Sequence, residues 1–90
     1  TRIYDGDTIE VFHAGQSFKA RFACIDAPEL HQAPFGAASK QYLSRLLPGQ
    51  VRLKIVDQDR YGRQVAEVYT PDNRFVNQAM VAAGQAVLYP

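Results

Sequence analysis

The sequence predicts a mainly β domain of the α+β class, and three observations support this prediction. Five segments show the period-two alternation, or the density of β-branched and aromatic residues, that is typical of strands. Two further segments repeat apolar residues at helical spacing. With 90 residues the chain has room for one core of ordinary size, so we expect residues 1–90 to form a single domain, the core of a longer chain.

The first third of the chain is expected to form three strands joined by tight turns, which is an antiparallel meander. These strands comprise residues 1–4, 8–12 and 17–25. Gly15, which can adopt positive φ, marks the turn between the second and third strands. Pro28 ends the third strand because it lacks an amide donor and restricts the preceding residue. Within that strand we expect Cys24 to be a small buried hydrophobe.

The rest of the chain alternates helices with strands. The predicted elements are a loop over residues 29–35, a helix over 36–47, a strand over 51–55, a polar loop over 57–62, a strand over 65–69 and a second short helix over 76–83. Leu43 and Met80 lie on the apolar faces of the two predicted helices. Gly49 and Gly84 follow the helices as stop signals.

This order of elements predicts a five-stranded OB-type barrel, with a helix between strands 3 and 4 and a second short helix after strand 5. A barrel of this type closes its sheet edges and commonly binds oligonucleotides on one face. Other small α+β folds also have five strands, so the order of elements leaves those folds open.

Composition excludes several classes of protein. Ten Lys and Arg residues against nine Asp and Glu give a formal charge of +1, which excludes a strongly basic nucleic-acid coat. Anion binding must therefore depend on where the charges are placed. The single cysteine excludes an internal disulfide and a cysteine-based zinc site. Apolar runs are far shorter than the ~20 residues that span a bilayer, so we expect no membrane contact from this segment.

Four carboxylates are placed at the ends of predicted strands. Asp5 and Asp7 lie in the first turn, Asp26 ends the third strand, and Glu29 follows Ala27 and Pro28. Carboxylates gathered at one end of a small barrel repel one another unless a cation lies among them. Oxygen ligands suit a hard cation such as Ca²⁺ or Mg²⁺. The alternative is that these are ordinary turn residues, a common use of aspartate.

Two arginines are placed where they could bind phosphate. Arg21 lies inside an otherwise apolar strand, and Arg63 begins the fifth strand. The guanidinium fork matches two phosphate oxygens, although either side chain could instead extend from the sheet into water. Arg21 and Asp26 are five residues apart, so strict alternation puts them on opposite faces unless the strand bends.

Three motifs in this order and at these separations resemble the thermonuclease family, whose type is staphylococcal nuclease. The motifs are Asp5-Gly6-Asp7-Thr8, then Arg21 with Ile25-Asp26-Ala27-Pro28-Glu29, then Asp59-Arg60-Tyr61-Gly62-Arg63. The resemblance continues into Val76-Asn77-Gln78-Ala79-Met80 and so covers nearly the whole chain. It implies an OB-type fold and a nuclease activity.

The resemblance also assigns roles to individual residues. Asp7, Asp26 and the Ala27 carbonyl match the ligands of Ca²⁺, with Mg²⁺ as the alternative cation. Glu29 matches the carboxylate that positions or deprotonates the attacking water, and Arg21 and Arg63 match the arginines that bind the phosphate.

Further positions match residues that bind the substrate. Tyr61 matches a tyrosine that contacts a substrate phosphate, and Arg60 replaces a lysine beside it. The family's base-stacking tyrosine aligns best with Pro90, and Tyr89, one position earlier, is the candidate for that role.

The implied function is hydrolysis of DNA and RNA, with single strands favoured and little sequence preference, by cleavage of the 5′ P–O bond. The family resemblance also implies a monomer and a secreted, periplasmic or surface-anchored parent protein. The near-zero net charge predicts weaker substrate capture than in a strongly basic relative. His31, two residues after Glu29, is expected to be an exposed loop histidine.

Two other functions stay open. One is a non-catalytic OB-fold module that binds nucleic acid or protein, and the other is an accessory part of a larger protein. The intact metal and arginine positions favour the enzyme over the binding module. Size-exclusion and activity assays on a longer chain would separate the accessory role.

Overall fold

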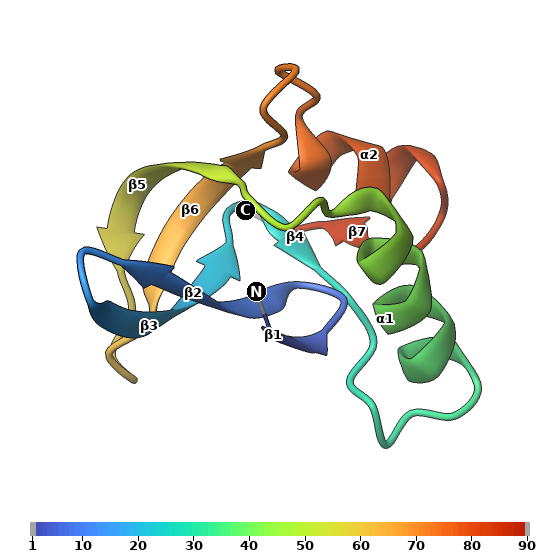
Figure 1. Cartoon of the computed structure of the whole chain (residues 1–90). Helices are drawn as coiled ribbons and strands as arrows, with labels where there is room; N and C mark the ends of the chain where they lie inside the picture. The colour runs from blue at the N-terminus through green and yellow to red at the C-terminus, as the bar shows by residue number, and fades with distance from the viewer. Residues whose placement is uncertain (1, 90) are drawn as a thin grey trace.

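A computed structural model describes residues 2–89 as a five-stranded mixed sheet, a two-stranded sheet and two helices (Figure 1). The strands are β1 (Arg2–Asp5), β2 (Thr8–His13), β3 (Gln16–Phe22), β4 (Ile25–Asp26), β5 (Arg52–Gln58), β6 (Gln64–Tyr69) and β7 (Val87–Leu88); the helices are α1 (Phe35–Leu46) and α2 (Val76–Ala82). Two predicted positions lie outside the described residues: Thr1, the start of the predicted first strand, and Pro90, which aligns with the base-stacking tyrosine. The mainly β, α+β class is confirmed.

The predicted meander is confirmed by the pairing of β1, β2 and β3. The β2–β3 hairpin turns at Ala14 and Gly15, which both have positive φ, 54° and 79°. Two central residues with positive φ give a turn whose twist matches that of the flanking strands. β3 then pairs in parallel with β6, and β6 pairs antiparallel with β5, so the sheet order is β1-β2-β3-β6-β5.

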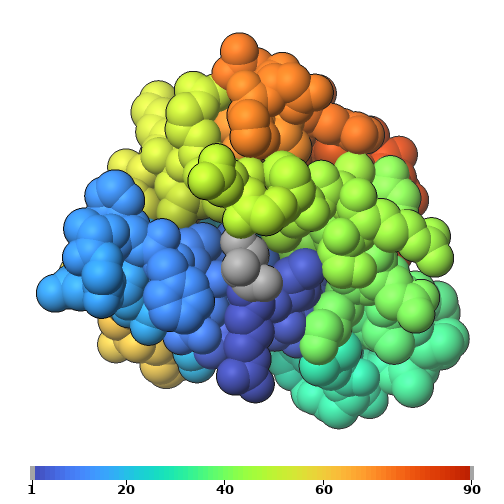
Figure 2. All heavy atoms as spheres, in the orientation of Figure 1, coloured from blue at the N-terminus to red at the C-terminus, as the bar shows by residue number. Residues whose placement is uncertain are grey.

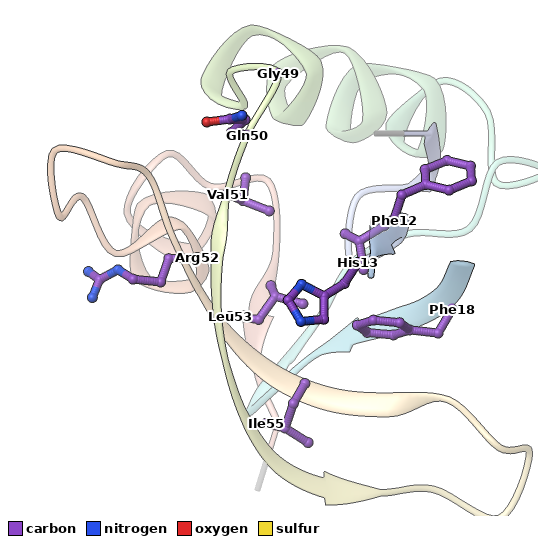
Figure 3. A pocket seen from close by; sticks show the side chains of 10 residues that line it. Phe12, His13, Phe18, Gly49, Gln50, Val51, Arg52, Leu53 and Ile55 are labelled. Carbon is purple, nitrogen blue, oxygen red and sulfur yellow. The ribbon is translucent and has the colours of Figure 1, made fainter. Parts of the chain in front are cut away.

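One detail of the predicted barrel needs correction, because the sheet of the described residues is open. β1 and β5 form its two edges and do not pair with each other within residues 2–89. Within residues 2–89 the pairing of β1 with β2 is described as far as Arg2 and Glu10, and β2 continues to His13. The gap between the β2–β3 hairpin and β5 is a cavity of about 740 Å³, across which His13 and Phe18 face Leu53 and Ile55 (Figure 3).

The core lies between the inner face of the sheet and the two helices. α1 contacts β1, and α2 contacts β6 and α1, so both helices gather at one end of the sheet (Figures 1 and 2). The fully buried side chains include Ile9, Phe22, Leu43, Val68 and Met80. The predicted core positions of Leu43 and Met80 are thereby confirmed. No helix within residues 2–89 is long and apolar enough to cross a membrane.

The predicted third strand is broken near its end. β3 stops at Phe22, and the chain turns at Cys24, which has a positive φ of 64°. Two residues then form β4, which pairs with β7 in a separate small sheet that the sequence did not predict. The expectation that Cys24 is buried is wrong: its left-handed turn conformation leaves the side chain exposed, while Ala23 is buried in its place.

Asn77 connects α2 to the sheet and to this turn. It is 2% exposed, and its side-chain carbonyl accepts a hydrogen bond from the Val68 N–H at 2.9 Å. Its amide donates to the Ala23 and Ala66 carbonyls at 3.0 and 3.1 Å. One buried side chain therefore satisfies backbone groups of β6 and of the turn after β3, which keeps these groups paired inside the core.

We predict that Asn77→Ala lowers the free energy of unfolding by about 2–4 kcal/mol, because it leaves the buried Val68 N–H and Ala23 carbonyl without their side-chain partner. Urea denaturation measures the change. Gln78→Ala, at an exposed position of the same helix, is the matched control and should change stability by less than about 0.5 kcal/mol. Equal losses in the two variants would contradict a structural role for the Asn77 side chain.

Candidate active site

The site is built around Asp7, which lies in the turn between β1 and β2. Asp7 is buried, with 5% of its surface exposed. Its Oδ1 accepts a hydrogen bond from the Thr8 hydroxyl at 3.0 Å, and its Oδ2 accepts one from the Ala27 N–H at 2.8 Å. Gly6 allows this turn to pack against α1, since a Cβ at Gly6 would lie 2.0 Å from the Ser39 Oγ. The carboxylate of Asp7 is thus fixed by both the turn and the segment after β4.

Arg21 joins Asp7 to Asp26. One terminal nitrogen lies 3.1 Å from the Asp7 Oδ2, and the other lies 3.5 Å from the Asp26 Oδ1. The side chains of Arg21 and Asp7 are largely buried, whereas that of Asp26 is 55% exposed. The bend at Cys24 turns the chain after Arg21 so that Asp26 returns to the same guanidinium. The strand bend that the spacing of these two residues requires is therefore present.

The charge of the Asp7 carboxylate is only partly offset by its neighbours. Burial raises the pKa of the Asp7 carboxyl, and the neighbouring Asp5 carboxyl raises it further. The Ala27 N–H and the Arg21 guanidinium lower the pKa of Asp7 but do not reverse the effect. An additional cation beside Asp7 would therefore stabilise its ionised form.

The atoms around Arg21 that could coordinate a metal ion are all oxygens, which are the ligands of Ca²⁺ and Mg²⁺. Two carboxylates meet here, and the Ala27 that follows Asp26 carries the predicted carbonyl ligand. Within residues 2–89 no group of three or more His, Cys, Asp and Glu side chains is arranged to hold a metal ion. The residues fit a hard cation only as a partial ligand set, since Ca²⁺ takes about 6–8 oxygens and the remainder would come from water or phosphate.

Glu29 lies on the loop between β4 and α1, with its side chain 66% exposed. The side-chain oxygen of Gln32 accepts a hydrogen bond from the Glu29 N–H at 2.8 Å. Gly36 packs against this loop so closely that a Cβ there would lie 1.9 Å from the Glu29 carbonyl oxygen. His31 is exposed, as predicted, and its Nδ1 lies 3.3 Å from the Glu29 Oε2. Within the described residues no hydrogen bond or ion pair joins Glu29 to the Arg21 cluster.

A second cluster lies in the loop between β5 and β6 and consists of Arg60, Tyr61 and Arg63. Tyr61 is 71% exposed, and the two guanidinium carbons lie 5.1 Å (Arg60) and 5.7 Å (Arg63) from its ring centre. Arg60 also donates a hydrogen bond to the Tyr61 hydroxyl at 3.0 Å. This loop therefore presents an exposed aromatic ring with a positive charge on each of two neighbours.

Asp59 holds this second cluster in place, and the sequence reasoning assigned it no role beyond its motif. Its Oδ2 accepts a hydrogen bond from the Arg63 Nε at 2.7 Å, and its Oδ1 accepts two from the N–H groups of Tyr61 and Arg63, each at 2.9 Å. Partial desolvation alone raises the pKa of the Asp59 carboxyl, but these hydrogen bonds bring it below its usual value. The signal available in the sequence was an aspartate at the start of a polar loop, four residues before an arginine.

The two arginine clusters lie on neighbouring strands. β3 pairs in parallel with β6, with Ala20 opposite Gln64 and Arg21 opposite Val65. Arg63 directly precedes Gln64, so the loop cluster begins beside the strand that carries Arg21. No hydrogen bond or ion pair connects the two clusters in the part of the chain that the structure describes.

Tyr89 lies next to the turn that ends β3. Its N–H donates a hydrogen bond to the Cys24 carbonyl at 2.8 Å and so extends the pairing of β7 with β4. The side chain is 59% exposed. The structure thus places an accessible aromatic residue directly after β7, the strand that pairs with Asp26.

Comparisons with known proteins identify the family of this chain. The sequence pattern of the family described as "Staphylococcal nuclease homologue" matches residues 19–90. An "Uncharacterized endonuclease" of Escherichia coli O157:H7 is 43% identical over 89 residues, which cover 98% of this chain and 58% of that protein. A "Micrococcal nuclease" of Shigella flexneri is 40% identical over 97 residues, covering 98% and 55% of the two chains. A Haemophilus influenzae "Uncharacterized endonuclease" is 44% identical over 90 residues, covering 98% and 49%.

The chain spans about half the length of these curated relatives. The family match includes Arg21, Asp26 and the loop cluster of Arg60, Tyr61 and Arg63, and the relatives align with nearly the whole chain. On these grounds, the chain belongs to the family of staphylococcal nuclease homologues.

Proposed function

We propose that this domain is a metal-dependent nuclease that hydrolyses DNA and RNA with little sequence preference. The observation that carries the proposal is the Arg21 cluster, in which one guanidinium contacts a buried and an exposed carboxylate. Membership of the nuclease family and relatives named as endonucleases support the same activity.

In this proposal Asp7, Asp26 and the Ala27 carbonyl hold Ca²⁺, with Mg²⁺ as the alternative. When bound, the cation would polarise the phosphodiester and offset part of its negative charge. The raised pKa of Asp7 supports the assignment, because the buried carboxylate gains from added positive charge. The exposure of Asp26 supports it as well, since one ligand then faces the solvent from which substrate arrives.

Arg21 and Arg63 are the proposed donors to the phosphate. Each guanidinium carries parallel N–H groups that match two phosphate oxygens, and both would stabilise the charge that develops on phosphorus-bound oxygens during attack. Of the three side-chain nitrogens of Arg63, only Nε donates a hydrogen bond to Asp59, so the two terminal nitrogens can bind the substrate. Arg21 contacts carboxylates through both terminal nitrogens, so its contact with phosphate requires sharing them.

Glu29 is the proposed residue that orients or deprotonates the attacking water. Its carboxylate is exposed on a loop that Gln32 and Gly36 hold in place. Glu29 would accept a proton from the water as its oxygen forms the new bond to phosphorus, the 5′ P–O bond would break, and the leaving 5′ oxygen would take up a proton from solvent. Tyr61, Arg60 and Tyr89 would contact the strand beside the scissile phosphate, and their exposure favours single strands over duplex.

A second function, a non-catalytic module that binds nucleic acid or protein, is supported by one observation. Glu29 makes no hydrogen bond or ion pair with the Arg21 cluster within the described residues, so the structure itself does not link the proposed base to the phosphate-binding groups. A monomer would suit either function, because each cluster is supplied by a single chain.

The first test is the degradation of denatured DNA by the purified domain, with Ca²⁺ and with excess chelator. We expect cleavage only with the cation, and we expect Glu29→Gln to lower turnover by ~10²-fold or more, the scale for losing one general base. Glu67→Gln is the matched control, because Glu67 accepts a hydrogen bond from Tyr69 on the sheet. Retention of intact DNA by the folded protein, with or without cation, would support the binding module instead.

The second prediction concerns Arg63. Arg63→Ala should lower kcat/KM by ~10²-fold or more, and Arg63→Lys should recover only part of the loss because lysine lacks the fork. Arg74→Ala removes the same charge from an exposed turn and should leave kcat/KM as in the wild type. Steady-state kinetics on a defined oligonucleotide measures all three. If Arg63→Lys matched the wild type, the bidentate role would be refuted.

The third prediction concerns pH and Asp59. Because its pKa in the folded state lies below the ordinary 3.8, Asp59 stabilises the fold above that pH and loses this contribution as the pH falls through the lower value. Asp59→Asn should therefore show a shallower fall in unfolding free energy below about pH 4 than the wild type. It should also lower kcat/KM at neutral pH by ~10-fold, since Arg63 loses its charged anchor.

Urea denaturation across the acid range and steady-state kinetics measure these two effects of Asp59→Asn. Asp57→Asn, on the exposed strand β5, is the control. Identical acid profiles for the Asp59 variant and the wild type would show that the hydrogen bonds to this carboxylate do not couple to folding.

A further inference from the structure

We propose that Arg2, Tyr4 and Lys19 form a basic strip that binds backbone phosphates of a nucleic-acid strand beyond the scissile phosphate. The proposal rests on the proposed nuclease function and extends its substrate site along the sheet. The strip lies on β1 and β3, outside the motifs that indicate the catalytic groups.

Strand register places the strip on the same face as Arg21. Arg2 pairs with Glu10, and Glu10 pairs with Lys19, so the three form one row across β1, β2 and β3. Lys19 and Arg21 are two residues apart on β3 and therefore point to the same face, about 7 Å from each other along the strand. The row thus begins one step from the arginine that contacts the two carboxylates.

Tyr4 lies on this face as well, because it is two residues after Arg2 on β1, and a β-bulge occurs at its position. Ile3 pairs with Ile9 and Asp5 pairs with Thr8, so Tyr4 is the additional residue between them. A bulge of this kind redirects a side chain, and bulges are common beside active sites. The Tyr4 ring lies 4.7 Å from the Lys19 Nζ and 5.2 Å from the Arg2 guanidinium carbon.

The charges of the strip are available to an anion. Within residues 2–89 neither Arg2 nor Lys19 forms an ion pair with a carboxylate, and both residues are exposed. Glu10 lies between them in the row but is not within ion-pair distance of either. The Tyr4 ring restrains both cations, which lowers the entropy lost when they bind phosphate.

The strip explains how a chain with a formal charge of +1 could still bind a polyanion. Lys19 lies on β3, next to β6, the strand that Arg63 precedes, because Ala20 pairs with Gln64. Arg2 lies on β1, on the other side of β2, so the cations follow one another across the sheet from the loop before β6 to β1. A strand of phosphates that crosses the sheet can contact these cations in turn, so local placement replaces overall charge.

The test uses the double variant Arg2→Gln/Lys19→Gln with two substrates, a 12-residue oligothymidylate and a mononucleoside p-nitrophenyl phosphodiester too short to reach the strip. We expect kcat/KM for the long substrate to fall ~10-fold relative to that for the short one. The slope of log Kd against log salt for the oligonucleotide should become less steep by about 1.4, which corresponds to two single-strand phosphate contacts.

The control is Arg45→Gln/Arg74→Gln, which removes the same charge from exposed positions on α1 and on the turn before α2. It should leave both the substrate ratio and the salt slope as in the wild type. Glu10→Gln, which removes the acid within the row, should tighten oligonucleotide binding several-fold.

The outcomes separate the strip from the nuclease. If both substrates are cleaved and the double variant behaves as its control does, the strip is refuted and the nuclease assignment stands. If the wild type cleaves neither substrate, the nuclease assignment fails. Fluorescence anisotropy of the oligonucleotide then decides the strip, since an unchanged salt slope in the double variant would refute it.

Discussion

The burial of one carboxylate governs the architecture of the candidate site. A charged group inside a protein requires nearby hydrogen bonds and an opposite charge, and Asp7 obtains them from the Ala27 N–H and from Arg21. Both partners follow the β2–β3 hairpin in the sequence. The segment after β3 must therefore return toward Asp7. The bend at Cys24 provides that return, and Asp26 reaches the same guanidinium as a consequence.

The two arginine clusters are held by different means, and this suits different roles. Arg21 is largely buried and is fixed through a buried acid, so its position depends on the core. Arg63 is held by Asp59 through contacts within one exposed loop, so its position depends on local hydrogen bonds and can adjust. If both arginines bind phosphate as proposed, a site with one rigid and one adaptable guanidinium accepts a substrate of variable sequence, which agrees with the weak specificity that we propose.

The core supports this site through residues that take no part in the proposed reaction. Asn77 ties the second helix to the turn that positions Asp26, although it lies far from it in sequence. Gly6 and Gly36 allow the turn of Asp7 and the loop of Glu29 to approach Ser39 and the start of α1. The open gap lined by Phe18 and Leu53 is bounded by the far end of β2, and no residue of the two arginine clusters lines it.

The class of fold, the meander, both helices and the residue types of the candidate site could be predicted from the sequence, because period-two and helical patterns and turn residues are local signals. Which charges meet could be seen only in the folded chain. Strict alternation separates Arg21 from Asp26, and a positive φ at a cysteine could not be foreseen from pattern. The anchoring role of Asn77 and the open edges of the sheet also depend on contacts between distant segments, which local propensity does not encode. Asp59 anchors Arg63 within one loop, and the folded geometry of that loop was needed to reveal the contact.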